Sequence, residues 1–377
     1  MAAFTHLLRD VHQILFPNVE QHAIPSLDGA LSPNEALDHC RRIGEPLPGA
    51  DDIAEGPDGA LYVSAGPRVL RLTGPGYQTR AVVAEFKTDV GGLTVHPDGR
   101  LIVCIAGRGL AAVDARGRQS WLNQVEDQPL NCLTSVAAAL DGNIFVSEGS
   151  QLNTAVEWRR DLMQKNRGGR VIVCGPGFES PKVLIRGLPY PYGLAFSRDE
   201  RFLWFTESWS HRVCRAAVLG RDLGRVEPII RNLPGYPARL GRAVGGGFWL
   251  SIFGLRTHLI EFVLREDDFR QEMMGTIAPQ YWIAPALATS GDALEPMQSG
   301  SIKALGIQKP WAPPRSYGLI ARIDEDGNVV ESLHSRVDGR IHGVTGVRVV
   351  GARVLAVSKG RNCLVELPSP ARGDKQG

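Results

Sequence analysis

A turn followed by a short run of strand-forming residues recurs along the chain. The turn contains Asp-Gly or a related pair, and the residues after it are apolar, β-branched or aromatic. Asp-Gly supplies the positive φ of a tight hairpin turn, so each copy predicts the connection between two antiparallel strands. The copies cover Pro57–Val63, Pro97–Val103, Leu140–Val146, Arg198–Phe205, Gly245–Leu250 and Gly351–Val357.

The spacing of these copies indicates how the strands are grouped. Gly59 and Gly99 are 40 residues apart, and Gly99 and Gly142 are 43 residues apart. This is the length of a four-stranded propeller blade. Six copies therefore predict an all-β fold, a six-bladed β-propeller.

Three segments depart from the repeat. Residues 1–45 are interpreted as an N-terminal helical extension, because apolar residues near its start recur at helical spacing. Alternation is lost over residues 265–314, which predicts a long insertion between blades 5 and 6 over one face, as a lid or as a structural flap. The propeller is expected to span residues 46–368, followed by a flexible tail over 369–377. The apolar positions of the expected helix are Phe4, Leu7, Leu8, Val11, Ile14 and Leu15.

Composition agrees with this architecture and excludes several classes of protein. The 43 Gly and 25 Pro among 377 residues suit many tight turns, and 43% hydrophobic residues argue against a disordered chain. A net charge of +2 gives no electrostatic case for nucleic-acid binding. No uninterrupted apolar stretch approaches the ~20 residues of a transmembrane helix.

The cysteines bear on the compartment. Six of them are scattered without a CxxC pair, and the N-terminus lacks the basic and apolar regions of a secretory signal. Reduced thiols and a cytoplasmic location are therefore predicted. The oligomeric state is left open.

Several longer motifs carry a resemblance to a known family. They are Leu27–Asn34, Gly187–Gly193, Phe205–Val213, Asn232–Pro237 and Gly246–Leu250. Through these motifs the chain, from about Ile24 to Pro368, resembles the strictosidine-synthase-like and SMP-30/gluconolactonase six-bladed propellers. In pattern it is closest to the members that are like adipocyte plasma-membrane-associated protein. The resemblance implies a small-molecule substrate in a pocket on the propeller axis.

The resemblance also implies where a metal would bind. Hydrolytic members of the family hold one divalent cation, usually calcium, which polarises a lactone or ester carbonyl. The ligand positions fall on Asp51 and Asn131, but the other two positions are occupied by Tyr192 and Arg239. With two of four ligands absent, a calcium site is disfavoured. A guanidinium and a phenol would instead suit direct binding of an anionic group, and the alternative is a decayed site filled by side chains.

Metal-free acid–base catalysis is the other mechanism that the resemblance offers. The glutamate that acts in the last blade of the alkaloid-condensing synthase corresponds here to Gly346, and the nearest titratable residue upstream is His342. His211 matches a histidine of that synthase, and a histidine can act as a general base near neutral pH. The catalytic candidates are thus His342, His211 and Asp51. The substrate-binding candidates are Asn131, Tyr192, Arg239 and Trp209.

Two further residues have mainly structural interpretations. Glu207, at the end of a strand, is interpreted as a buried hydrogen-bonding carboxylate rather than a catalytic one. Cys132 could act as a nucleophile only if His211 lay next to it in space.

Three functions remain open at this point. The leading one is a small-molecule hydrolase of the lactonase or arylesterase type with a degenerate metal site. The second is a metal-free lyase or synthase of the strictosidine-synthase kind. The third is a ligand-binding propeller without catalysis.

Overall fold

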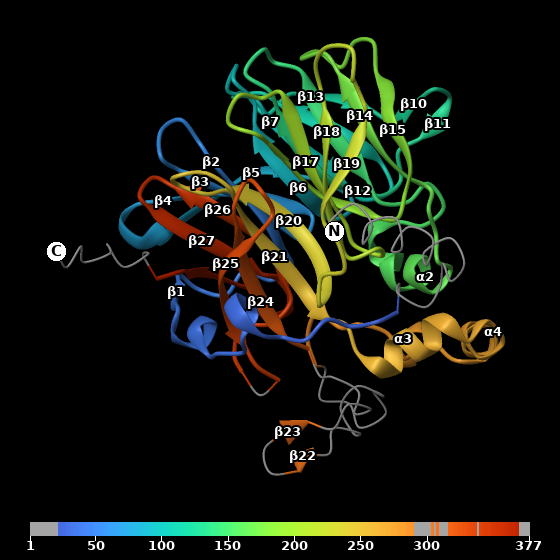
Figure 1. Cartoon of the computed structure of the whole chain (residues 1–377). Coiled ribbons are helices and arrows are strands. Elements are labelled where there is room, and N and C mark those ends of the chain that lie inside the picture. The colour runs from blue at the N-terminus through green and yellow to red at the C-terminus, as the bar shows by residue number, and fades with distance from the viewer. Residues whose placement is uncertain (1–21, 290–302, 305–306, 309–315, 338, 369–377) are drawn as a thin grey trace.

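The strands form a closed ring of six sheets, as the sequence repeat predicts. The computed structural model describes residues 22–289, 303–304, 307–308, 316–337 and 339–368 (Figure 1). Its main sheets are six, each with four antiparallel strands. The innermost strand of every sheet contacts the innermost strand of the next, and the first also contacts the sixth. The all-β six-bladed propeller is thus confirmed.

The first three blades follow the chain without exception. Blade 1 comprises β2 (Ala50–Glu55), β3 (Leu61–Ala65), β4 (Arg68–Thr73) and β5 (Thr79–Glu85). Blade 2 comprises β6 (Val90–Val95), β7 (Leu101–Ile105), β8 (Gly109–Val113) and β9 (Gln119–Leu122). Blade 3 comprises β12 (Leu133–Ala138), β13 (Ile144–Glu148), β14 (Gly169–Cys174) and β15 (Lys182–Leu188).

The last three blades include one sheet interrupted by an insertion and one exception to chain order. Blade 4 comprises β16 (Pro191–Phe196), β17 (Phe202–Glu207), β18 (Arg212–Ala217) and β19 (Val226–Ile230). Blade 5 comprises β20 (Gly235–Arg242), β21 (Phe248–Leu255), β24 (Gly318–Ile323) and β25 (Val329–Ser335). Blade 6 comprises β26 (Val344–Val350), β27 (Arg353–Ser358), β28 (Cys363–Glu366) and β1 (Arg41–Ile43).

The ring is closed by the N-terminal part of the chain. β1 pairs antiparallel with β28, with Arg41 opposite Glu366 and Ile43 opposite Leu364. A boundary at residue 46 therefore separates β1 from the sheet to which it belongs. The described part of the predicted extension continues with the 3₁₀ turns η1 (Gly29–Leu31) and η2 (Ala36–His39), which lie against β25.

The long insertion lies inside blade 5, and the prediction that it lies between blades 5 and 6 is wrong. β24 follows the insertion but pairs with β21, which precedes it. The described part of the insertion contains α3 (His258–Arg265), α4 (Asp267–Thr276), η5 (Pro279–Tyr281), and the small hairpin of β22 (Lys303–Ala304) and β23 (Ile307–Gln308). Residues 290–302, 305–306 and 309–314 of the predicted 265–314 segment lie outside the described residues, as do the predicted N-terminal helix, which falls within residues 1–21, and the tail over 369–377.

Helices gather at one side of the propeller (Figure 1). The connection from β13 to β14 of blade 3 contains η4 (Ala155–Glu157) followed by α2 (Trp158–Met163). Leu162 of α2 shares a hydrophobic cluster with Ile260 of α3 and Met273 of α4. No helix in the described ranges is long and apolar enough to cross a membrane. The remaining elements are η3 (Pro75–Tyr77), η6 (Lys359–Arg361), and a hairpin of β10 (Gln124–Val125) and β11 (Gln128–Pro129).

Apolar side chains fill the space between neighbouring blades. Phe145 of blade 3 meets Phe196 of blade 4 edge to face, with ring centroids 5.2 Å apart. Trp204 of blade 4 lies 4.7 Å from Phe248 of blade 5. Buried aromatic pairs of this kind add to the stabilisation that comes from burial of their area. These contacts join neighbouring blades. All six cysteines are free thiols.

Candidate functional site

Each innermost strand is interrupted by a bulge near its start. In every blade the register with the second strand shifts there, so one or two residues on the inner strand have no partner opposite. Bulges bend a strand and redirect its side chains, and they are common beside functional sites. The residues within the shifts are Asp51–Asp52, Gly91–Gly92, Thr134, Tyr192–Gly193, Ala238–Arg239 and Thr345.

Hydroxyl groups on the second strands stabilise these bulges. The backbone N–H of Asp52 donates to Ser64 Oγ over 2.8 Å, and that of Gly193 donates to Thr206 Oγ1 over 2.8 Å. Ser251 Oγ donates to the carbonyl oxygen of Arg239, also over 2.8 Å. Backbone groups that the shift removes from the strand ladder are satisfied in this way.

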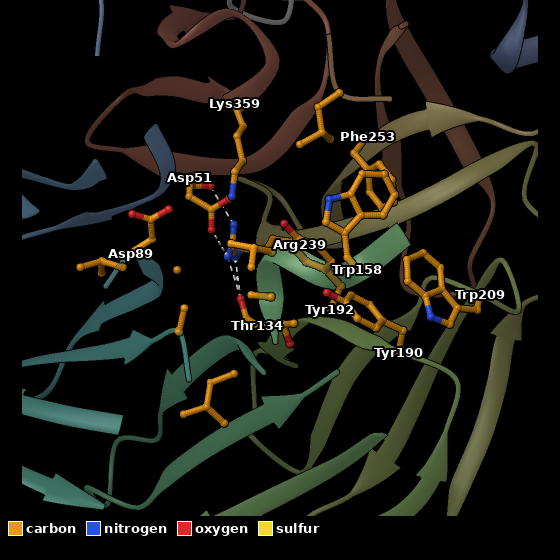
Figure 2. A pocket seen from close by; sticks show the side chains of 17 residues that line it. Asp51, Asp89, Thr134, Trp158, Tyr190, Tyr192, Trp209, Arg239, Phe253 and Lys359 are labelled. Atoms are coloured by element: carbon orange, nitrogen blue, oxygen red, sulfur yellow. Dashed lines mark hydrogen bonds and ion pairs between the residues drawn. The ribbon is translucent and has the colours of Figure 1, made fainter. Parts of the chain in front are cut away.

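The bulges of five blades converge on one pocket. Its volume is about 280 Å³. Figure 2 shows charged side chains gathered at one end and aromatic rings at the other. The lining residues are Asp51, Asp89, Val90, Gly91, Ala106, Leu133, Thr134, Ala155, Val156, Trp158, Tyr190, Tyr192, Trp209, Arg239, Phe253, Leu287 and Lys359.

Arg239 occupies the centre of the polar end. Its Nη1 donates to the backbone oxygen of Asp51 over 2.7 Å, and its Nη2 lies 2.6 Å from Asp51 Oδ2. Nη2 and Nε also donate to the backbone oxygen of Thr134 over 2.7 and 3.1 Å. The guanidinium carbon lies 5.0 Å from the ring centre of Tyr192. Arg239 is only 1% exposed, so it is a buried side chain that joins blades 1, 3, 4 and 5.

Two neighbouring carboxylates compensate this buried cation. Burial alone would raise the pKa of Asp51, but Arg239 and Lys359 hold that pKa well below its usual range. Burial would lower the pKa of Arg239, and Asp51 and Asp52 raise it instead. Asp52 Oδ2 lies 3.3 Å from Arg239 Nε. Asp51 and Arg239 are therefore both charged throughout the neutral range.

Lys359 is the more accessible cation of the pocket. It follows β27 in η6, and its Nζ lies 2.9 Å from Asp51 Oδ1. Its side chain is 40% exposed, whereas that of Arg239 is 1% exposed. Four of the five N–H groups of Arg239 are used in the contacts above. Lys359 is thus the cation that a ligand can reach without breaking the network at the axis.

The other end of the pocket is an aromatic wall, formed by Trp158, Tyr190, Tyr192, Trp209 and Phe253. Tyr190 stacks on Trp209 with centroids 4.3 Å apart, and Trp158 meets Phe253 edge to face at 5.5 Å. The pKa values of Tyr190 and Tyr192 are raised by burial, so both rings carry neutral hydroxyls. This wall suits an apolar or aromatic part of a ligand.

A buried carboxylate supports the aromatic wall from behind. Asp161 of α2 is fully buried, and its Oδ1 accepts a hydrogen bond from Trp209 Nε1 over 2.7 Å. Its Oδ2 accepts from the side-chain amides of Asn153 and Asn166 over 2.9 and 2.7 Å. Asp161 therefore fixes the orientation of Trp209 and holds α2, which carries Trp158, against blade 4.

The structure brings four of the predicted site residues together and separates three. Asp51, Tyr192, Trp209 and Arg239 line the pocket. Asn131 does not line it; its amide Nδ2 donates to the backbone oxygen of Gln151 over 2.9 Å, and its N–H donates to Glu148 Oε1.

Neither histidine candidate lines the pocket. His211 is buried, with Nδ1 3.1 Å from the oxygen of Gly235, and burial lowers its pKa to about 3. His342 is buried with Nδ1 2.8 Å from Ser316 Oγ and Nε2 2.7 Å from the oxygen of Arg336. In both side chains a ring nitrogen is held by the protein backbone, which is typical of histidines with a packing role.

The two residues with mainly structural interpretations have protein partners. Glu207 accepts a hydrogen bond from Ser210 Oγ. The Sγ of Cys132 lies 3.6 Å from the hydroxyl of Tyr190, and burial raises the pKa of the thiol to about 12. A thiol with such a pKa is protonated at neutral pH and is a poor nucleophile.

The donor set at the axis does not fit a divalent cation. Within the described residues no group of three or more His, Cys, Asp or Glu side chains could hold a metal ion. The Asp51 carboxylate is taken by Arg239 on one oxygen and faces Lys359 on the other. The cationic side chains of Arg239 and Lys359 therefore occupy the positions at which a metal ion would need further oxygen ligands.

Thr134, Asp89 and Lys359 line the pocket, although none of them is a candidate from the sequence. One signal could have found Thr134. Thr134 lies eight residues before Gly142, whose φ is +89° in the hairpin turn. The same interval separates the other pocket-lining bulge residues from the positive-φ residue of their own turn, namely Asp51 from Gly59, Gly91 from Gly99, Tyr192 from Glu200 and Arg239 from Gly247.

Fold and pocket define a six-bladed β-propeller with a small-molecule-sized pocket on its axis. The family model described as the SMP-30/Gluconolactonase/LRE-like region matches residues 58–238. The chain is 26% identical over 248 residues to protein STRICTOSIDINE SYNTHASE-LIKE 13 of Arabidopsis thaliana; this match covers 65% of the chain and about half (55%) of the plant protein. It is 26% identical over 304 residues to the adipocyte plasma membrane-associated protein of Bos taurus, covering 72% of the chain and 73% of that protein.

Solved structures agree with the fold. A gluconolactonase from Xanthomonas campestris superposes with a TM-score of 0.57 at 18% identity, over 86% of this chain and 87% of that one. A calcium-binding protein, regucalcin, from Agrobacterium tumefaciens has a TM-score of 0.55 at 13% identity, over 86% and 91% of the two chains. The resemblance to the strictosidine-synthase-like and SMP-30/gluconolactonase propellers is thus confirmed.

Proposed function

We propose that this chain is a small-molecule hydrolase of the lactonase or esterase type, with its substrate in the axial pocket. At the family level, the gluconolactonase and strictosidine-synthase-like relatives support a hydrolase or lactonase-like role for the propeller. The observation that carries the proposal is the two-ended pocket. It joins an accessible ammonium group beside a carboxylate to an aromatic wall.

The polar end can supply the chemistry of carbonyl hydrolysis. Attack of water on a lactone or ester carbon moves negative charge onto the carbonyl oxygen, and the Lys359 ammonium group stabilises that charge. The Asp51 carboxylate keeps Lys359 oriented and accepts a hydrogen bond from the attacking water. The C–O bond to the leaving group breaks, and the proton lost by the water ends on the leaving oxygen. The aromatic wall holds the rest of the substrate.

A screen of lactones and aryl esters, with and without EDTA, tests this proposal. We expect turnover that a chelator leaves unchanged. Lys359→Met should lower kcat by about 10²–10³-fold, which is the effect of removing one donor from a developing oxyanion. Lys182→Met, which removes an exposed lysine of β15 in blade 3, is the matched control and should keep wild-type turnover. Absence of turnover on the whole panel, or full activity of Lys359→Met, would contradict the proposal.

A ligand-binding propeller without catalysis is the second candidate. It is favoured by the charge pairing at the polar end, because Asp51 has a low pKa and is a weak base. Tight binding of a panel compound without its conversion, measured by calorimetry, would support this candidate. The synthase alternative lacks a comparable observation. Gly346, at the position of the synthase glutamate, offers no acid, and a Cβ added there would lie 3.0 Å from Asp52 Oδ1.

A further inference from the structure

The buried guanidinium of Arg239 is surrounded by oxygen atoms from two other blades. Asp51 contributes its backbone oxygen at 2.7 Å and Oδ2 at 2.6 Å. Thr134 contributes its backbone oxygen at 2.7 Å from Nη2, and Asp52 contributes Oδ2 at 3.3 Å from Nε. Two carboxylate and two carbonyl oxygens therefore converge on a single cationic group, and these are the oxygen types that a hard cation prefers.

Cationic side chains face the two carboxylates at the axis, as a divalent ion would. Asp51 and Asp52 are both buried and adjacent in sequence, so their two negative charges lie close together. Arg239 contacts both carboxylates, and Lys359 supplies a second positive charge at Asp51 Oδ1. Arg239 and Lys359 thus provide the charge of +2 that one divalent ion would bring, and Arg348 Nη2 lies 3.6 Å from Asp52 Oδ1.

The position of Arg239 in the chain explains how one side chain can contact oxygens of both blade 1 and blade 3. Arg239 lies in the bulge of β20, where the strand has no partner residue opposite, and Ser251 anchors its backbone oxygen. The ring of Tyr192 covers the guanidinium from blade 4. The side chain is therefore fixed at both ends, as an ion in a rigid site would be.

We infer that Arg239 is a built-in replacement for a divalent cation at the propeller axis, and that its removal uncovers a latent oxygen site for Ca²⁺. The wild-type protein then needs no metal to hold blades 1, 3 and 5 together. A variant that exchanges the guanidinium for a small amide leaves the two carboxylates with only the partly exposed Lys359 and Arg348 as counter-charges and adds one further oxygen ligand. Such a variant should depend on a divalent cation for its stability.

Thermal unfolding of wild type and Arg239→Asn in EDTA and in millimolar CaCl₂ tests the inference. We expect the wild-type melting temperature to be the same in both solutions. Arg239→Asn should melt several degrees lower in EDTA and recover at least half of the loss in CaCl₂, because an ion that binds only the folded state stabilises it. Terbium luminescence should report one bound ion per chain in the variant and none in the wild type.

Two controls separate a specific site from general charge effects. Arg348→Asn removes an arginine whose Nη2 lies 3.6 Å from the other oxygen of Asp52, and this variant should not respond to CaCl₂. Arg239→Lys keeps a positive charge and should also be insensitive to calcium. Because these measurements read stability and ion binding, their outcome is independent of whether the protein hydrolyses esters.

Three results would overturn the inference. The first is a wild-type protein that binds calcium stoichiometrically or loses stability in EDTA. The second is an Arg239→Asn protein that folds but gains no stability in CaCl₂. The third is an Arg239→Asn protein that remains unfolded in CaCl₂ as well as in EDTA.

Discussion

The two ends of the axial pocket are built in different ways. At the polar end, Arg239 reaches oxygens of blades 1 and 3 from blade 5, so one side chain connects residues as far as 188 positions apart. The aromatic wall consists of rings that pack on one another and are positioned from behind by Asp161. The polar end therefore depends on compensation between buried charges, and the wall depends on packing and on one network of hydrogen bonds. Perturbations of the two ends should differ in size and in pH range.

The largest effect is expected from Asp51→Ala. This change removes one of the two carboxylates that compensate the buried Arg239, and breaking one side of a buried ion pair typically costs about 3–5 kcal/mol. Urea denaturation followed by circular dichroism measures the loss. The control is Glu85→Ala in the same blade, whose ion pair with Arg68 is exposed and should contribute less than about 1 kcal/mol. Equal losses in the two variants would contradict the dependence on charge compensation.

An intermediate effect is expected from Asp161→Ala. The change leaves the Trp209 indole N–H and two side-chain amides without their acceptor, at a cost of about 2–3 kcal/mol. Urea denaturation measures this cost, and a shifted tryptophan emission should report the altered wall. Asp161→Asn keeps one acceptor oxygen and should lose less. If both variants match the wild type in stability and emission, Asp161 does not position the wall.

The smallest effect is expected from a change of pH. Each end of the pocket should lose its contribution to stability in a different pH range. The pKa of Asp51 is depressed in the fold, so its contribution is present above about pH 4 and is lost as the pH falls below that value. The pKa values of Tyr190 and Tyr192 are raised, so their contribution is present below about pH 10 and is lost as the pH rises above it.

Two variants assign these limbs to the two ends. Asp51→Asn should flatten the acid limb of a plot of unfolding free energy against pH, by up to about 1.4 kcal/mol per pH unit. Tyr192→Phe should flatten the alkaline limb by a similar slope and leave the acid limb unchanged. An acid limb that is the same in Asp51→Asn and wild type would show that other groups control it.

The fold could be predicted from the sequence because its signals are local. The Asp-Gly turns at Gly59, Gly99 and Gly142 have the positive φ that the sequence predicts, with the second strand directly after each turn. The prediction that the insertion lies between blades 5 and 6 is wrong because β24, which follows the insertion, pairs with β21, which precedes it. Such a pairing depends on contacts distant in sequence, and the pattern within residues 318–323 does not reveal it.

The site could be predicted only in part. Asp51, Tyr192, Trp209 and Arg239 line the pocket, and all four were singled out through the family resemblance. The ion pair of Arg239 with Asp51 could not be derived, because it depends on how blades 1 and 5 face each other across the axis. His211, which matches a histidine of the synthase, and His342, the titratable residue nearest upstream of Gly346, are candidates from the sequence, yet a ring nitrogen of each contacts a backbone oxygen outside the pocket lining.

The closure of blade 6 by β1 bears on how the protein is made. Arg41 and Glu366 are 325 residues apart in sequence, yet their side chains form an ion pair in the closed ring. Until β28 has been synthesised, β1 has no partner, and contacts of such long range slow folding more than they change stability. A chain shortened before Cys363 would leave β27 and β1 with unpaired edges, and unpaired edges promote association between chains. Premature termination near the end of this protein is therefore expected to yield aggregates rather than a five-bladed product.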